Sequence, residues 1–163
     1  MKKLFLLIAF MVASSLAASQ QAPASSRLLP NVALLDHEAN PTSSERLSLE
    51  SNWILAVLDA SLPSARIFLS TLAEKPLTFN SQITVLLIGD DRTIKDLSSI
   101  QEKLPGIRWV YSKELNVIKN LNLPGTPAMI GLTKNQKIAW QFSGSQTSPE
   151  KLNSMIQGWV RTQ

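Results

Sequence analysis

Two serines, Ser61 and Ser64, stand three residues apart in the stretch Ser-Leu-Pro-Ser, between two apolar runs of the sequence. A serine hydroxyl acts as a nucleophile when an adjacent general base removes its proton, and histidine is the usual base. The chain contains one histidine, His37, which falls in a predicted N-terminal hairpin. A histidine without a nucleophile and an orienting group beside it is not a catalytic site. We therefore expect no hydrolytic site at the serine pair.

Carboxylates are the other side chains that could do chemistry near this stretch. Asp59 ends the apolar run that precedes the serines. Burial there would raise its pKa and suit it to a proton relay, whereas an exposed Asp59 would cap the turn. Asp90 and Asp91 resemble a metal-binding pair, but their position before a predicted helix favours a helix cap. The sequence predicts no metal site and no cofactor.

Composition excludes further classes of chemistry. The 163-residue chain contains no cysteine, which excludes disulfides and thiolate metal ligands. No glycine-rich phosphate loop occurs. The 16 basic and 12 acidic residues are scattered rather than gathered into a basic stripe, so we expect no nucleic-acid partner.

The N-terminus has the pattern of a secretory signal. Lys2 and Lys3 precede an apolar run that is too short for a comfortable membrane span, and small residues follow up to Ser19. We predict a signal peptide over residues 1–19, with small residues placed for cleavage after Ala17, and a flexible lead-in over 20–28. The mature protein would be periplasmic or secreted, without a membrane span. An uncleaved segment would instead anchor it to the membrane.

The rest of the chain, residues 29–163, is predicted to form one domain. A β-hairpin over 31–49 turns around Asn40 and Pro41, and buried or alternating runs predict strands at 52–60, 81–91, 107–112, 127–133 and 137–144. Apolar spacing and caps predict helices at 63–75, 91–104, 113–122 and 149–160, the last capped by Ser148. This alternation of strands and helices indicates an α/β domain whose mainly parallel sheet has an antiparallel edge.

This order of elements, together with Gly125-Thr126-Pro127 before the last hairpin, resembles the thioredoxin fold. The resemblance covers residues 29–160 and is closest to exported thioredoxin-like proteins related to peroxiredoxins and to the reductases of cytochrome c maturation. It implies a mixed central sheet flanked by helices, with an N-terminal β-hairpin extension. It also implies a cis peptide bond before Pro127, beside the active-site loop.

In that family the active-site loop reads Cys-x-x-Cys. The resemblance places Ser61 and Ser64 on the two cysteines and Pro63 on the proline between them. A register one residue later places Leu62 and Ala65 there instead, with Arg66 on a basic residue that commonly follows. Either register lacks the thiolate that disulfide exchange and peroxide reduction require, so the resemblance implies a redox-inactive loop.

The resemblance also implies what such a loop retains. We expect a binding face for an extended polypeptide of the cell envelope, made by Ser61, Leu62, Pro63, Ser64, Thr126 and Pro127. One alternative is a packing subunit of an envelope assembly. Another is a thiol–disulfide oxidoreductase, lipid-anchored if Ser19 also replaces a cysteine, whose cysteines are serine in this chain. The sequence does not indicate the partner's identity or the oligomeric state.

Overall fold

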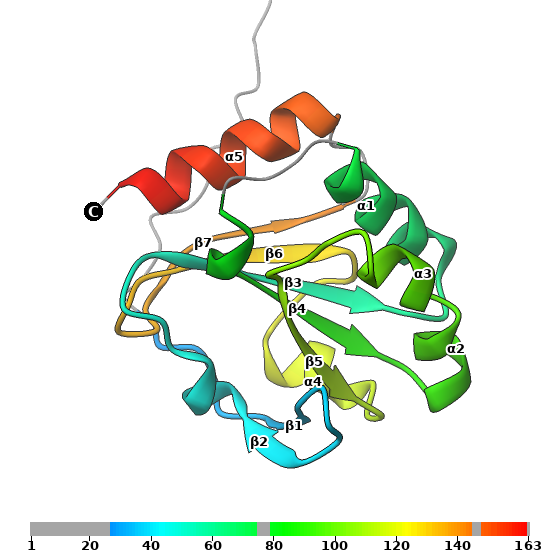
Figure 1. Cartoon of the computed structure of the whole chain (residues 1–163). Helices are drawn as coiled ribbons and strands as arrows, with labels where there is room; N and C mark the ends of the chain where they lie inside the picture. Colours follow the sequence, from blue (N-terminus) through cyan, green and yellow to red (C-terminus); the bar gives the residue numbers. More distant parts are fainter. Residues whose placement is uncertain (1–26, 75–78, 145–147, 163) are drawn as a thin grey trace, which may run out of the picture.

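The computed structural model contains a single mixed sheet of seven strands, in the order β2-β1-β5-β4-β3-β6-β7 (Figure 1). The structure describes residues 27–74, 79–144 and 148–162, so the predicted signal peptide and the lead-in up to residue 26 lie outside the described residues. The strands are β1 (Ala33–Leu35), β2 (Pro41–Ser43), β3 (Trp53–Asp59), β4 (Ile83–Ile88), β5 (Arg108–Ser112), β6 (Ala128–Leu132) and β7 (Ile138–Ser143). β3, β4 and β5 run parallel, and the remaining neighbours pair antiparallel.

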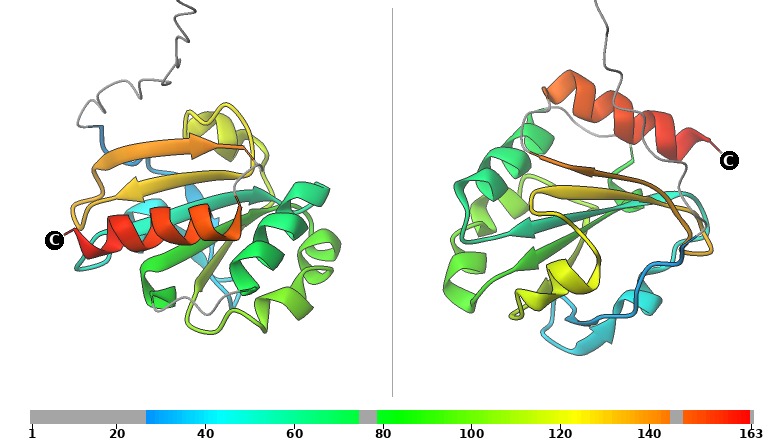
Figure 2. Two further views of the ribbon diagram at one scale, coloured as in Figure 1. Left: turned by 90° about the horizontal axis from the view of Figure 1, so that it is seen from above. Right: turned by 180° about the vertical axis from the view of Figure 1, so that it is seen from behind.

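Helices cover both faces of the sheet (Figure 2). They are α1 (Pro63–Ala73), α2 (Asp91–Lys95), α3 (Ser98–Gln101), α4 (Asn116–Asn120) and α5 (Pro149–Arg161), with short 3₁₀ helices η1 (Ser44–Leu47) and η2 (Asn80–Gln82). α1, α3 and α5 bury their apolar residues against one face. α4, η1 and the N-terminal segment cover the other.

Strand β3 lies inside the sheet, between β4 and β6, and belongs to both cores. Its alternate residues point to opposite faces, as a strand requires. Ile54, Ala56 and Leu58 join the core under α1 and α5, whereas Trp53, Leu55 and Val57 join the core under α4. All six are buried, which is why this stretch of the sequence is a continuous apolar run.

Two predicted elements differ from the structure. The predicted helix over 91–104 is two short helices. They are separated by a tighter turn at Leu97, whose N–H donates to the carbonyl of Ile94, three residues back. The tightening lets Leu97 enter the core while the turn before it stays at the surface. The N-terminal hairpin forms, but its turn is Asp36–Asn40 rather than Asn40 and Pro41. Pro41 opens the edge strand β2, where its missing N–H costs nothing.

Arg27 and Leu28, at the end of the predicted lead-in, are paired with the sheet. The carbonyl of Arg27 accepts a hydrogen bond of 2.8 Å from the N–H of Ile138, the first residue of β7. Leu28 forms an isolated antiparallel bridge with Lys137. The segment that pairs with the sheet therefore includes Arg27 and Leu28.

Ser44 ties η1 to the N-terminal segment, and its loss should destabilise the fold. Its buried hydroxyl accepts from the N–H of Val32 at 2.9 Å and donates to the carbonyl of Pro30 at 2.8 Å. In Ser44→Ala both groups lose this partner, so we expect the free energy of unfolding to fall by about 1–3 kcal/mol. Urea unfolding measures the change. The control is Ser43→Ala, since no side-chain cap bond forms at Ser43. Equal stability of the two variants would contradict this account.

Candidate functional site

The Ser61–Ser64 loop and the Thr126–Pro127 segment lie at the same end of the strands β3 and β6. The antiparallel register pairs Val57 of β3 with Ala128 of β6. Beyond this pair β3 comes to its end, and the segment that precedes β6 contains Pro127 and Thr126. The Thr126–Pro127 peptide bond is cis. Pro127 is buried, and its carbonyl accepts a hydrogen bond of 2.9 Å from the N–H of Gly144.

Asp59 shapes the loop that leaves β3. Its Oδ1 accepts from the N–H of Ser61 at 2.9 Å and from the Ser61 hydroxyl at 2.6 Å. The N–H of Leu62 bonds to the Asp59 carbonyl at 3.1 Å. These bonds are those of a carboxylate that caps a turn, one of the two roles considered for Asp59. Its role as a proton relay remains a prediction.

The start of α1 determines which loop residue meets the free N–H groups of the first helical turn. Leu62 is the N-cap residue, in extended conformation, and Pro63 is the first helical residue. Leu62 is 42% exposed, whereas Ala65, three residues later, is buried in the core. Ser61 lies before the cap, and Ser64 lies inside the first turn, half-buried. Position 62 is therefore where a thiolate would gain most from the helix N-terminus.

His37 does not approach the serines. It lies in the turn that follows β1, and β5 and β4 separate β1 from β3. Three strand spacings put this turn about 14 Å from the line of β3. The imidazole is exposed and lies 3.7 Å from the carboxylate of Glu38. His37 therefore forms no pair with Ser61 or Ser64.

The two adjacent aspartates have separate partners. Asp90 caps α2, as predicted, by accepting from the N–H and hydroxyl of Thr93 at 2.8 and 2.9 Å. The backbone bond, followed by the hydroxyl bond, lowers the pKa of Asp90. Asp91 forms an ion pair of 2.9 Å with Lys113. Over residues 27–74, 79–144 and 148–162, no three His, Asp or Glu side chains gather as metal ligands.

Solved structures of similar shape share low sequence identity with this chain. A thiol:disulfide interchange protein from a Bacteroides species superposes with a TM-score of 0.61 and 16% identity, over 85% of this chain and 91% of that one. A thiol:disulfide interchange protein of the thioredoxin family from Chlorobium tepidum gives 0.59 and 12%, over 85% and 99%. The chain has a thioredoxin-like fold. A peroxiredoxin-like protein from Aquifex aeolicus shares this fold, with a TM-score of 0.58 and 7% identity over 86% of this chain and 92% of that one.

No protein-family model matches the chain, and no curated protein matches it in sequence. The likeness therefore establishes the thioredoxin-like fold and confirms the predicted class, a mixed sheet flanked by helices with an N-terminal hairpin. Neither register of the degenerate motif holds a cysteine in this chain. None of the helices in the described part of the chain is long and apolar enough to cross a membrane.

The thioredoxin-like scaffold also carries an apolar hollow that sequence reasoning missed. It measures about 590 Å³ and is lined by Leu115, Ile118, Lys119, Asn122, Leu123 and Pro124. Leu115 is 61% exposed, and Pro124 lies two residues before Thr126. A signal was present in the sequence, because Leu115 and Ile118 form a second apolar stripe beside the buried pair Val117 and Leu121.

Proposed function

We propose that this thioredoxin-like protein binds an extended polypeptide segment beside Thr126 and the Ser61–Ser64 loop, and that it catalyses no thiol–disulfide exchange. The observation that carries the proposal is the free backbone of Thr126. Within the described residues, its N–H and C=O have no hydrogen-bond partner, and the residue is only half-buried. Unpaired backbone groups beyond the end of a strand can take an incoming chain into the ladder.

Exposed apolar side chains supply the second half of a polypeptide site. Leu62 lies on the loop and is 42% exposed. Leu115 stands in the hollow that reaches Pro124, close in sequence to Thr126. Alternate side chains of an extended segment point to opposite sides, so a segment paired at Thr126 can place apolar side chains on such surfaces. We therefore expect apolar residues in the bound segment.

The redox part of the proposal rests on the whole chain rather than on the loop alone. A thiolate begins disulfide exchange and a second thiol resolves it, and this chain contains neither. The hydroxyl of Ser61 is held by Asp59 and has no redox couple. The signal-like composition of residues 1–19 supports export. An envelope polypeptide is therefore the expected partner.

Amide chemical-shift mapping tests the proposed function. The probe is reduced and carbamidomethylated α-lactalbumin, an unfolded polypeptide without free thiols or added charge. We expect the largest shifts at the amides of Thr126, Leu62 and Leu115. Shifts confined to α5 or to the β1–β2 hairpin would contradict the proposal.

A further inference from the structure

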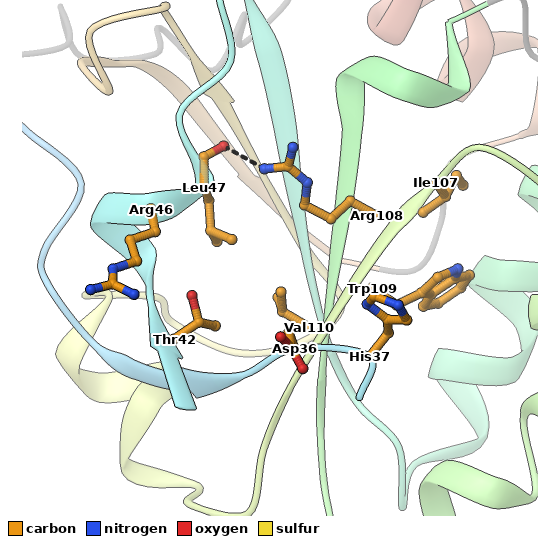
Figure 3. Close-up of a pocket in the computed structure, with 9 residues that line it drawn as sticks. All are labelled: Asp36, His37, Thr42, Arg46, Leu47, Ile107, Arg108, Trp109 and Val110. Carbon is orange, nitrogen blue, oxygen red and sulfur yellow. Dashed lines mark hydrogen bonds between the residues drawn. The ribbon is translucent and has the colours of Figure 1, made fainter. Parts of the chain in front are cut away.

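Strand β5 has an outer edge that the sheet leaves open. β5 pairs with β4 from Arg108 to Ser112, but it pairs with β1 only at Tyr111, opposite Leu35. β1 ends there because the chain turns away at Asp36. Beside the open edge lies a hollow of about 510 Å³ (Figure 3). We call this hollow the basic slot, and its lining residues are Asp36, His37, Thr42, Arg46, Leu47, Ile107, Arg108, Trp109 and Val110.

The backbone of Trp109 faces the basic slot. The N–H of Gly89, next after β4, donates to the carbonyl of Ser112 at 2.9 Å, so the polar backbone groups of Ser112 point toward β4. Successive residues of a strand alternate in this direction, so those of Tyr111 and Trp109 point the other way. Tyr111 meets β1. In the part of the chain that the structure describes, the N–H and C=O of Trp109 have no partner on that side.

The charge in the basic slot is positive and largely uncommitted. The guanidinium of Arg46 has no partner among the described residues, and Arg108 uses one N–H in a bond of 3.3 Å to the carbonyl of Leu47. The carboxylate of Asp36 is already engaged by the N–H groups of Asn40 and Glu38, at 2.9 Å each. These bonds, that from Asn40 foremost, lower the pKa of Asp36. Several guanidinium donors therefore remain for a ligand acceptor.

The slot also has apolar walls and a useful size. Leu47, Ile107 and Val110 are buried, and the indole of Trp109 is half-buried. In Figure 3 Arg46 extends from η1 and Arg108 from β5; the guanidinium of Arg108 is turned toward the carbonyl of Leu47, and that of Arg46 points away from Arg108. The volume lies within the range of ligand pockets, roughly 300–1,000 Å³. An open strand edge, apolar walls and the unpaired guanidinium of Arg46 together match an extended peptide with a carboxylate.

We propose that the basic slot binds an extended peptide segment that carries a carboxylate. The segment pairs with the N–H and C=O of Trp109 as one added strand residue, and its carboxylate accepts hydrogen bonds from the guanidinium of Arg46. β4 and β3 lie between this slot and the Thr126 edge of β6. The two sites are therefore independent, and this one adds an acidic partner to the proposed function.

Titrations of the ¹⁵N-labelled full chain test the slot, with the backbone amide of Trp109 as the readout. The probes are acetyl-Val-Glu-Val-Thr-amide, its Gln counterpart, acetyl-Val-Thr-Val-Thr with a free C-terminus, and acetate. We expect the Glu peptide to move the Trp109 amide and to bind about tenfold more tightly than the Gln peptide, since a charge-assisted bond is lost. Tighter binding of the free C-terminus than of Glu would also support the slot and would assign it to chain ends.

The matched variants are Arg46→Met and Lys151→Met, which remove one positive charge each. Arg46 has no partner among the described residues, so its replacement should leave the fold intact. Arg46→Met should weaken the Glu peptide to the level of the Gln peptide, whereas Lys151→Met on α5 should not. The proposal would be overturned by equal affinities for the Glu and Gln peptides, by an unchanged chemical shift of the Trp109 amide, or by the same shifts from acetate alone.

Discussion

The double variant Leu62→Cys/Ala65→Cys is expected to exchange disulfides, whereas we expect no exchange by the unchanged chain, which contains no cysteine. Position 62 is the N-cap of α1, where the free N–H groups of the first turn stabilise a thiolate. Position 65 follows three residues later, on the same face of the helix and facing the core. Residues at this spacing lie close enough for a disulfide. The thiol introduced at position 62 should therefore have a pKa below about 8.5.

The matched control is Ser61→Cys/Ser64→Cys, which tests the other register of the motif. A thiol at position 61 would precede the cap and would lie beside the carboxylate of Asp59, whose charge raises a thiol pKa. Thiolate absorbance against pH measures both pKa values, and equilibration with glutathione measures exchange. A lower pKa and faster exchange in the control than in Leu62→Cys/Ala65→Cys would contradict this account of the loop. If both folded variants failed to exchange disulfides, the likeness of the loop to the family would also be contradicted.

Leu115→Asp is expected to weaken binding of the unfolded polypeptide by about a hundredfold. Burying a leucine contributes about 1.5–3 kcal/mol, and each 1.4 kcal/mol is tenfold in affinity. The introduced carboxylate adds a desolvation cost in the same hollow. Leu115 is 61% exposed, so the fold should tolerate the change. Isothermal titration with carbamidomethylated α-lactalbumin measures the affinity.

Leu28→Asp is the matched control for that variant. Leu28 is 58% exposed, almost as much as Leu115. It pairs with Lys137 beside the start of β7, whereas Thr126 lies near the end of β7. Its replacement adds the same charge and removes the same apolar side chain away from Thr126. We expect its affinity to match that of the unchanged chain. An equal loss in both variants would mean that binding follows net charge rather than the proposed face.

Much of the scaffold could be predicted because local pattern and burial agree. The apolar run of β3 is buried on both faces, and α5 begins where predicted, with Ser148 accepting from the N–H of Lys151 and Pro149 following it. The last hairpin turns at Thr133–Lys137, between the strands predicted at 127–133 and 137–144. In these elements the residues that decide the structure are neighbours in the sequence.

The sites were harder to predict because they depend on residues that are distant in the sequence. The basic slot is lined by Arg46 and Arg108, which are distant in the sequence. The edge of β5 is open there because β1 pairs with β5 over a short stretch only. Helix α1 begins at Pro63, as predicted, and this start distinguishes the two registers of the degenerate motif because it makes Leu62 the N-cap residue. The apolar stripe that contains Leu115 was visible in the sequence. The hollow beside it also needs the turn that contains Pro124, which the stripe does not indicate.

Hydrogen exchange at the Thr126 amide tests the central claim most directly. In the free protein this N–H has no partner among the described residues, so it should exchange rapidly. When carbamidomethylated α-lactalbumin is bound, the account predicts clear protection of the Thr126 amide. A bound complex in which the Thr126 amide still exchanges at its free rate would contradict the claim that an extended chain pairs there.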